Sequence, residues 1–471
     1  MTPYAWTAAD ILQATGGTLL SGAPETAFSG IGIDSRSIVA GQLFVAIAGE
    51  THDGHRFVAD VLGQGVAGVV VDAAQLDRLP VDQMTAHPRV CVSVNDTTRA
   101  LGDMARFNRR RGALAVLAVT GSNGKTSTRT LMETVVGQQL TTLATTGNLN
   151  NHIGLPLTLF RLAPDHQAAV LELGMNHPGE ILYLGGICEP DVGVITNVGP
   201  AHLEGLGSLA NVARAKAELL ATIRAGGTAV LNADDPLVAA MADGFAHRVV
   251  YYGTTAKAQV RAENIVLTDA GTAFTLITPS GRLPVILATP ARVMVFNALA
   301  AAAVGEVVGI TLDRIKAGLE AFVPQAGRMG IRTLGRDIRL VDDSYNANPA
   351  SMAAAIETLA RMGGRRRTIA VLGDMLELGD QAAALHRQIG QTVAEHRIDR
   401  LYVTGAFAED VADGARQGGM APDRIVSDAK PALTDQLAAD LETGDIVLVK
   451  GSRGMAMETV VEAVCDWADD K

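Results

Sequence analysis

The stretch AVTGSNGKTST, residues 118–128, follows the apolar run LAVL at 114–117 and precedes a helical pattern. It is close to the phosphate-binding pattern G-x-x-x-x-G-K-[ST], which joins a strand, a glycine-rich turn and a helix. The first glycine of that pattern would fall at position 119, which is Val119. Three interpretations are open: a degraded loop, a plain strand–turn–helix corner, or a phosphate site of another design.

The residues that bind phosphate are nevertheless present. A helix N-terminus carries partial positive charge and points several backbone N–H groups at one spot. Lys125 is expected to neutralise a β- or γ-phosphate, and the hydroxyl of Thr126 to bind Mg²⁺. The missing glycine affects the entry of the loop alone, so we favour nucleotide binding. The other predicted members of the site are Gly121, Ser122, Asn123, Gly124 and Ser127.

A chain of 471 residues is too long for one ordinary core, so two to three domains are expected. The net charge of −11 disfavours binding to nucleic acid or an anionic membrane, and the basic runs at 109–111 and 365–367 are interpreted as solvated. Cys91, Cys188 and Cys465 are far apart, which fits a reducing compartment. The sequence lacks a signal-peptide pattern and an apolar stretch of about 18 residues, so we expect a cytoplasmic protein without membrane insertion.

Three stretches of the chain differ in their pattern of expected strands and helices. Residues 1–112 consist of short strands and turns with a few helices, and end in a helix near 97–108 and a basic linker. From 113 to 324, apolar strands alternate with helices, which predicts a mainly parallel sheet covered on both faces, with an antiparallel patch near 256–290. Residues 325–471 contain five further strand–helix units, which predict a Rossmann-like sheet. The predicted fold class is therefore α/β throughout.

Polar residues follow two of the central strands. Glu172 ends the apolar run in VLELGMN and is a candidate Mg²⁺ ligand, although a carboxylate there could also cap the next helix. His202 lies after the next strand, in the Gly- and Pro-rich loop NVGPAHLEGLG. A lone loop histidine is more often a surface residue, so both interpretations stay open. Because strand ends of a parallel sheet open onto one crevice, both side chains are expected near the nucleotide.

Lys216 lies on the apolar stripe of the helix SLANVARAKAELLATI, three residues past Ala213 and four before Leu220. A buried ammonium group is unfavourable, so such a lysine should be paired, neutral or modified. The alternative is a packed stem with its amine in water. The residues by themselves do not distinguish these states.

Two strand ends near the C-terminus are dense in polar groups. DDSYNANPASM at 342–352 places two carboxylates, a tyrosine and two asparagines before a helix that starts with proline. That density indicates ligand contact, although capping by Asn348 explains part of it. KGSRG at 450–454 follows the last strand and is either a second contact segment or a loop with solvated charges.

In their order along the chain, these motifs resemble those of the ATP-dependent Mur ligases of peptidoglycan synthesis. The family's loop reads T-G-[ST]-x-G-K-[TS], without the distant glycine, so Val119 marks an intact loop of this type. GNLNNHIGLPLTL, LELGMN, TNVGPAHLEGLGS and AKAEL follow in the family's order. DDSYNANPASM, VLGDMLELGD and VKGSRGMAME resemble the branch that adds a dipeptide, and the D-N-P-R signature of the diaminopimelate-adding branch is absent.

The resemblance implies three domains: a small N-terminal α/β domain that binds a uridine nucleotide, a central P-loop ATPase domain and a C-terminal Rossmann-like domain that binds the incoming dipeptide. The implied reaction joins D-Ala-D-Ala to UDP-MurNAc-tripeptide through an acyl phosphate, with ATP and two Mg²⁺ ions, in a monomeric enzyme. The third residue of the tripeptide, meso-diaminopimelate or L-lysine, stays open. A sister Mur ligase or a folylpolyglutamate synthase-like enzyme is the alternative, although folate ligases lack a separate uridine-binding domain.

The resemblance also implies roles for individual residues. Lys125 and Thr126 would bind the ATP phosphates and Mg²⁺, with Glu172 and His202 as further metal ligands. Lys216 would carry a carbamate, which turns a buried cation into an anion that bridges toward a second Mg²⁺.

Three sets of substrate contacts complete these expectations. The remaining ATP contacts would be Asn297, Arg328, Asp343, Tyr345 and Asn346. The UDP-sugar contacts would be Ser35, Arg36, Phe44, Ala46, Asn148, Asn150 and Asn151. The dipeptide contacts would be Lys450, Ser452 and Arg453.

Overall fold

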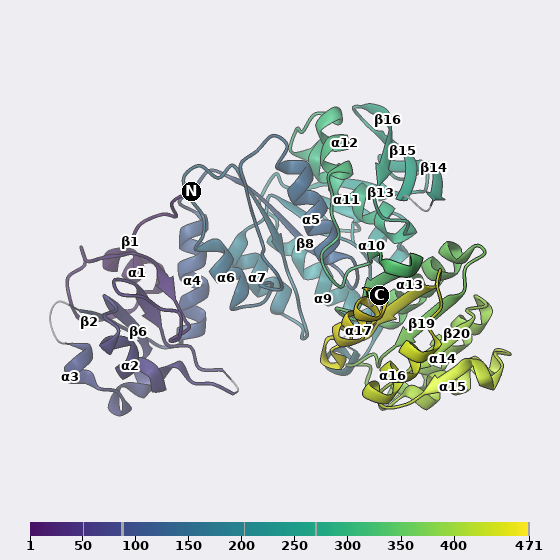
Figure 1. Ribbon diagram of the computed structural model, residues 1–471. Coiled ribbons are helices and arrows are strands. Elements are labelled where there is room, and N and C mark those ends of the chain that lie inside the picture. The colour runs from purple at the N-terminus through teal and green to yellow at the C-terminus, as the bar shows by residue number, and fades with distance from the viewer. Residues whose placement is uncertain (50, 86–88, 202, 269–270, 470–471) are drawn as a thin grey trace.

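The computed structural model describes the chain except for residues 50, 86–88, 202, 269–270 and 470–471. Figure 1 shows three α/β units side by side, coloured purple, blue to teal, and green to yellow along the chain. Each unit has its own main sheet, so the predicted α/β class is confirmed. The division at residues 112 and 324 stays a prediction. In the described part of the chain, no helix is both long and apolar enough to cross a membrane.

The N-terminal unit is built on a five-stranded sheet in the order β2-β7-β6-β5-β4. Strands β4 to β7 run parallel, and β2 pairs antiparallel with β7. The elements are β1 (Trp6–Thr7), α1 (Ala8–Thr15), β2 (Thr18–Ser21), β3 (Ala27–Phe28), β4 (Ile31–Gly32), β5 (Leu43–Val45), α2 (Val58–Gly63), β6 (Gly68–Asp72), α3 (Val81–Met84) and β7 (Val90–Val94).

Helix α4 (Thr97–Arg109) leads from this unit to the central one, where it packs against α6 and α7. The expectation that the basic run at its end is solvated is wrong for Arg109. Arg109 is 3% exposed and donates to the carbonyls of Cys188 and Glu189, while Arg110 pairs with the Glu189 carboxylate. The Arg109 guanidinium thus satisfies carbonyls at the end of α7 that have no partner within that helix.

The central unit is built on a nine-stranded sheet in the order β16-β15-β14-β13-β12-β11-β8-β10-β9. Strands β8 to β14 run parallel, and β14, β15 and β16 form the expected antiparallel patch. The strands are β8 (Ala115–Thr120), β9 (Thr142–Ala144), β10 (Ala168–Glu172), β11 (Val192–Ile195), β12 (Thr228–Asn232), β13 (Arg248–Gly253), β14 (Val260–Thr268), β15 (Gly271–Thr278) and β16 (Gly281–Leu287). The helices are α5 (Lys125–Val136), α6 (Gly154–Leu159), α7 (Glu180–Cys188), α8 (Leu203–Leu206), α9 (Leu209–Thr222), α10 (Pro236–Ala240), α11 (Arg292–Val307) and α12 (Leu312–Glu320).

Alternating side chains of β8 point to two different cores. Leu117 and Val119 pack with α5 and α11, whereas Val116 and Ala118 pack with α4, α7 and α9 on the other face. A strand buried on both faces is a continuous apolar run, which is why LAVLAV predicts a central parallel strand. The loop that follows β8 therefore leaves the carboxyl edge of a fully covered sheet.

The C-terminal unit is built on a six-stranded sheet in the order β17-β18-β22-β19-β20-β21. Five parallel strands match the predicted units, and β17 is an antiparallel edge strand that the sequence did not reveal. The strands are β17 (Gly330–Thr333), β18 (Arg339–Asp343), β19 (Thr368–Leu372), β20 (Arg400–Val403), β21 (Ile425–Ser427) and β22 (Ile446–Lys450). The helices are α13 (Pro349–Gly363), α14 (Ala382–Glu395), α15 (Ala408–Gln417), α16 (Lys430–Asp440) and α17 (Glu458–Asp469).

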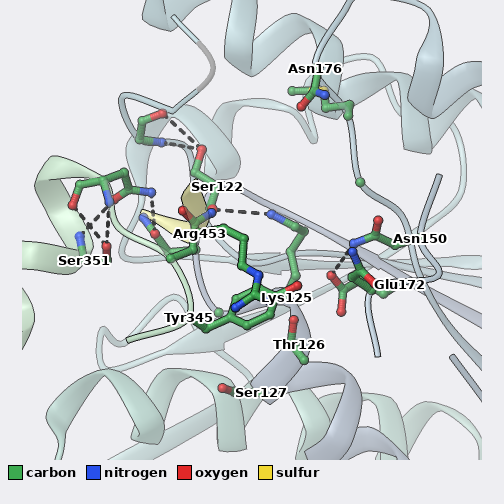
Figure 2. A pocket seen from close by; sticks show the side chains of 18 of the residues that line it. Ser122, Lys125, Thr126, Ser127, Asn150, Glu172, Asn176, Tyr345, Ser351 and Arg453 are labelled. Carbon is green, nitrogen blue, oxygen red and sulfur yellow. Dashed lines mark hydrogen bonds between the residues drawn. The ribbon is translucent and has the colours of Figure 1, made fainter. Parts of the chain in front are cut away.

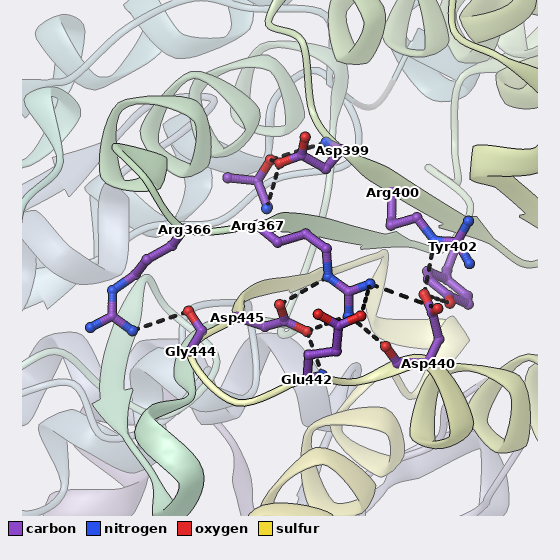
Figure 3. Close-up of polar contacts among 10 residues, drawn as sticks. Arg366, Arg367, Asp399, Arg400, Tyr402, Asp440, Glu442, Gly444 and Asp445 are labelled. Carbon is purple, nitrogen blue, oxygen red and sulfur yellow. Dashed lines mark hydrogen bonds and ion pairs between the residues drawn. The ribbon is translucent and has the colours of Figure 1, made fainter.

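The second basic run belongs to a polar cluster at the amino edge of this sheet, which Figure 3 shows. Arg367 donates to both carboxylate oxygens of Asp445 at 3.0 and 2.7 Å, and Arg400 donates to Asp440 at 2.8 Å. Tyr402 donates to the same Asp440 oxygen at 2.7 Å, and its burial raises its pKa to about 12. The expectation of a solvated run is therefore wrong for Arg367, which ties β19 to the turn before β22.

Replacing Asp445 by alanine should lower the free energy of unfolding of the C-terminal unit by about 2 kcal/mol. Asp445 is 2% exposed, and its loss removes the two-pronged partner of Arg367 and leaves the backbone N–H of Glu442 without its acceptor. Thermal unfolding of Asp445→Ala measures the effect. The control is Asp413→Ala, whose half-exposed carboxylate pairs with Arg416 and whose loss should change stability by less than about 0.5 kcal/mol. Equal melting temperatures for the two variants would contradict the prediction.

Candidate active site

A cavity of about 1160 Å³ lies where the three units meet. Its lining includes the start of α4, the loop at 122–127, Glu172 at the end of β10, and Asp343 and Tyr345 from the C-terminal unit. Small-molecule sites in proteins usually measure roughly 300–1000 Å³. The cavity is therefore large enough for more than one substrate.

Two glycines in the loop after β8 are required by the close approach of neighbouring groups. Gly121 has φ 152°, and a Cβ there would overlap with the hydroxyl of Thr196 at the end of β11. Gly124 has φ 77°, in the left-handed region, and a Cβ there would overlap with the side-chain amide of Asn297. Position 119 has no such requirement for glycine, because Val119 is a buried residue within β8 and precedes the loop. The loop is therefore intact without the glycine that the usual pattern has there.

Lys125 begins α5 and faces the cavity beside the loop (Figure 2). Its ammonium group donates to the carbonyls of Gly121 at 2.9 Å and Ser122 at 3.4 Å. Burial lowers the pKa of Lys125, the charge of Arg328 lowers it further, and Glu172 opposes this shift. An anion that binds at the loop would therefore find a desolvated cation already aimed at it. Thr126 and Ser127 line the same cavity.

Glu172 has a carboxylate that is only half satisfied. It is 2% exposed, and its Oε1 accepts a hydrogen bond from Asn150 at 2.7 Å, drawn in Figure 2. Its Oε2 is buried without a hydrogen-bond partner among the described residues. A buried carboxylate oxygen is unfavourable unless a donor or a cation satisfies it, and carboxylate oxygens are the ligands that Mg²⁺ prefers. The residues present thus fit a hard cation at this position.

Lys216 is 1% exposed on α9, which excludes the alternative of an amine in water. Burial lowers its pKa well below the usual value, and the charge of Lys125 lowers it further. Burial therefore shifts this amine toward its neutral form. His202, the other predicted ligand from this side, lies outside the described residues.

The predicted adenosine contacts lie together at the cavity beside the loop. Asn297 on α11 packs against Gly124, and Arg328, Tyr345 and Asn346 line the same space. The Arg328 guanidinium lies 4.1 Å from the centre of the Tyr345 ring. A guanidinium over an aromatic face holds both side chains in place. The structure thus brings these predicted residues together.

Asp343 and Lys450 are neighbours in register on β18 and β22 and form a buried ion pair. Lys450 is 2% exposed and also donates to the carbonyl of Asn346 at 2.9 Å. Burial raises the pKa of Asp343, while Lys450 opposes this shift. The pair braces the segment that carries Tyr345, so the ammonium group of Lys450 is already engaged.

The other two predicted dipeptide contacts differ from each other. Ser452 is 3% exposed, donates to the carbonyl of Ala347 at 3.3 Å and accepts from the backbone of Leu376 at 2.9 Å. Arg453 is exposed and lines the cavity, where Figure 2 shows it beside Tyr345. Its guanidinium carbon lies 5.6 Å from the centre of the Tyr345 ring. Arg453 therefore offers a side chain to a ligand, whereas Ser452 supports the loop from inside.

The predicted UDP-sugar residues fall into two groups. Asn148, Asn150 and Asn151 line the cavity. Ser35, Arg36, Phe44 and Ala46 instead lie at or near the carboxyl ends of β4 and β5. Phe44 and Ala46 are fully buried, so contact with a ligand there would use backbone groups.

The exposed guanidinium of Arg36 is held by Asp34, whose pKa it lowers to about 2. Asp34 and Arg36 follow β4 at the same sheet edge, and the carboxyl end of β7 leads from that edge to the cavity. The carboxyl edge of the N-terminal sheet therefore runs from the second group of predicted residues toward the cavity that the first group lines.

Several lining residues were missed by the sequence reasoning. Asp96, Thr98 and Arg99 follow β7 and start α4, and Asn176 and Tyr183 border the cavity from the central unit. Asp96 obeys the same rule as Glu172, since it is a polar residue directly after a buried strand. That signal was available, but a helix N-cap aspartate is common enough to hide it.

Three family models match consecutive parts of the chain. They are the Mur ligase family catalytic domain over residues 27–109, the Mur ligase middle domain over 119–305, and the Mur ligase glutamate ligase domain over 327–453. The chain is also 39% identical over 435 residues to UDP-N-acetylmuramoyl-tripeptide–D-alanyl-D-alanine ligase of Escherichia coli, with 92% of each chain covered. The chain belongs to the Mur ligase family.

Solved structures extend this similarity to the arrangement of the domains. MurF from Acinetobacter baumannii is 32% identical to this Mur ligase, with a TM-score of 0.89 and coverage of 99% of this chain and 100% of that one. MurF ligase from Thermotoga maritima, solved in complex with ADP, is 26% identical with a TM-score of 0.82, covering 93% and 97%. The family and the three-domain architecture that the motifs implied are confirmed.

Replacing Glu172 by glutamine should reduce turnover roughly 100-fold or more without lowering the melting temperature. The amide keeps the size of the side chain but removes the charge that a cation would need, and it relieves a buried carboxylate oxygen without a described partner. Steady-state kinetics and thermal unfolding of Glu172→Gln measure both effects. Full activity in this variant would exclude a metal-binding role for Glu172.

Proposed function

We propose that this Mur ligase joins D-Ala-D-Ala to UDP-MurNAc-tripeptide with the hydrolytic energy of ATP, giving UDP-MurNAc-pentapeptide, ADP and phosphate. The observation that carries this proposal is the cavity shared by three units, which gives three substrates one meeting place beside the phosphate loop. In support, the E. coli relative has this ligase activity in its name, and the T. maritima relative binds ADP. Both similarities cover more than nine-tenths of each chain.

The proposed reaction has two steps, phosphoryl transfer and amide formation. The terminal carboxylate of the tripeptide attacks the γ-phosphorus of ATP, the bond to ADP breaks, and an acyl phosphate forms. The amine of D-Ala-D-Ala then attacks the acyl carbon, phosphate leaves, and the amine loses a proton. Lys125 and the N–H groups at the start of α5 neutralise the transferring phosphoryl group. For this, the Lys125 ammonium exchanges its carbonyl partners for phosphate oxygens.

Two Mg²⁺ ions complete the proposed site. Thr126, Glu172, His202 and a carbamate on Lys216 would hold them, and the unsatisfied oxygen of Glu172 is the observation that fits a cation. When bound, Mg²⁺ neutralises charge on the phosphoryl oxygens during transfer. The protein holds its own part of the site rigid through Asn150, which orients the Glu172 carboxylate.

The carbamate on Lys216 is supported by the state of its amine. Carbamate formation requires a neutral nitrogen, which attacks carbon dioxide and releases one proton. The burial that lowers the pKa of Lys216 supplies that neutral form. The product is an anion, which the positive charge of Lys125 would stabilise.

The two organic substrates would approach from opposite sides. The uridine nucleotide would bind along the carboxyl edge of the N-terminal sheet, near Ser35, Arg36 and the backbone of Ala46, and its peptide would reach the loop past Asn148 and Asn151. The carboxylate of D-Ala-D-Ala would pair with Arg453, the exposed guanidinium on the C-terminal side.

The proposed enzyme is a cytoplasmic monomer with domains at 1–112, 113–324 and 325–471. Cys91, Cys188 and Cys465 are all unpaired in the described part of the chain, in keeping with a reducing compartment. ATP and UDP-linked precursors would meet the enzyme there.

Phosphate release from ATP, with each component omitted in turn, tests the proposed function. Phosphate should form only when ATP, UDP-MurNAc-tripeptide and D-Ala-D-Ala are all present, together with a pentapeptide product of the expected mass. Tripeptides ending in meso-diaminopimelate or in L-lysine, assayed in parallel, define the preferred substrate. Release that ignores the dipeptide would favour a sister ligase, and other amino acids and folates would then be tested as acceptors.

Replacing Lys216 by alanine should reduce turnover roughly 100-fold or more, because the proposed bridging anion is lost. Short carboxylic acids added to Lys216→Ala should restore part of the activity by occupying the vacated space as anions. The wild-type enzyme, assayed with the same acids, is the control and should gain nothing. Unchanged activity in the alanine variant would rule out the carbamate role.

A further inference from the structure

One side-chain hydrogen bond ties the phosphate loop to the C-terminal unit. Asn348 Nδ2 donates to Asn123 Oδ1 over 2.7 Å, across 225 positions of sequence. Asn123 is in the middle of the loop, and Asn348 is the residue directly before α13. Both residues line the cavity described above. The bond therefore joins two domains at the place where ATP would bind.

The loop side of this bond is held rigidly. The backbone N–H of Asn123 donates to Asn197 Oδ1 at 2.9 Å. The backbone carbonyl of Asn123 accepts from Thr196 Oγ1 at 2.7 Å and from Asn197 Nδ2 at 3.0 Å. These three hydrogen bonds fix the backbone of Asn123 to the segment after β11. A displacement of the Asn123 side chain would therefore also displace the loop.

The C-terminal side is equally well defined. Asn348 Oδ1 accepts the backbone N–H of Ser351 at 3.0 Å, and the backbone N–H of Asn348 donates to Ser351 Oγ at 3.0 Å. This capping box fixes which end of the Asn348 amide faces the helix. The NH₂ group consequently faces Asn123, so both ends of one amide are in use.

The pair lies where the loop, the segment after β11 and the first turn of α13 come together. A Cβ added to Gly199 would lie 3.6 Å from the side-chain nitrogen of Asn123 and 3.9 Å from the Cβ of Ala350 in the first turn of α13. A second contact between the two units, from the backbone N–H of Glu204 to the carbonyl of Glu377, lies elsewhere in the interface. Any rotation of the C-terminal unit would stretch the Asn123–Asn348 bond.

We propose that Asn348 is a positioning residue that couples the phosphate loop to the C-terminal unit, so that nucleotide binding and domain docking assist each other. The inference rests on the proposed function for its nucleotide, ATP. A helix cap alone does not require asparagine, because serine and aspartate cap equally well. The bond to Asn123 requires an acceptor for the helix and a donor for the loop on one short side chain, and asparagine supplies both.

The variant Asn348→Ser separates the two roles. Serine keeps the cap but cannot reach Asn123, so the dissociation constant for ADP, measured by calorimetry on the full chain, should rise about 2- to 10-fold. The KM for ATP should rise by a similar factor, with the KM for UDP-MurNAc-tripeptide unchanged. Asn348→Asp should weaken nucleotide binding further, since it also keeps the cap but places a carboxylate beside the loop's anion site. Unchanged ADP affinity in both variants would overturn the proposal and leave Asn348 as a cap.

A double-mutant cycle and a matched control sharpen the test. If the two side chains act through their mutual bond, Asn123→Ala combined with Asn348→Ser should weaken ADP binding no more than the worse single variant, and additive losses would contradict the proposal. The control is Thr7→Ala, which removes the capping box of α1 in the N-terminal unit and should lower the melting temperature without changing ADP affinity. A wild-type chain that binds ADP but ligates nothing would refute the proposed function and leave this coupling intact.

Discussion

The close contact between the ends of β8 and β11 is the constraint on which the active site depends. The loop after β8 passes so near Thr196 that Gly121 can carry no side chain, and Thr196 in turn holds the carbonyl of Asn123. Because these contacts fix the loop against the end of β11, its N–H groups and Lys125 point in one direction. It can do so only because β8 is fixed between two cores, by side chains that alternate from one face to the other.

The same principle assembles the rest of the cavity from three separate sheets. Parallel strands deliver their following residues to one edge, and residues that follow strands of all three main sheets line the cavity. Asp96 comes from β7, Glu172 from β10, and Asp343 from β18. An amide ligation driven by ATP has three substrates to align, and the proposed binding sites place one at each of these sheets. The polar cluster around Arg367 lies at the opposite edge of the C-terminal sheet, where it serves stability.

Some charged groups that line the cavity lack a partner that a ligand could supply, and others are already paired. Lys125 is a desolvated ammonium group beside the loop, and Glu172 keeps one carboxylate oxygen without a described partner. In contrast, Asp343 and Lys450 satisfy each other and brace the segment that presents Tyr345. The unsatisfied groups belong to the phosphate side, where anions and cations would bind. The satisfied pair belongs to the scaffold that holds the third unit against it.

The sequence by itself determined the fold class, the phosphate loop and the residues at strand ends, because these depend on local pattern: apolar runs of strand length, small residues in a turn, and polar residues directly after a strand. It could not show that Arg109 is buried, that Lys450 is engaged by Asp343, or that Asn123 meets Asn348, because each of these contacts joins distant segments. The sequence also left open whether Lys216 is buried, and the packing of helix α9 shows that it is. Only the tertiary structure decides which polar side chains find partners, since a partner is a matter of position in space.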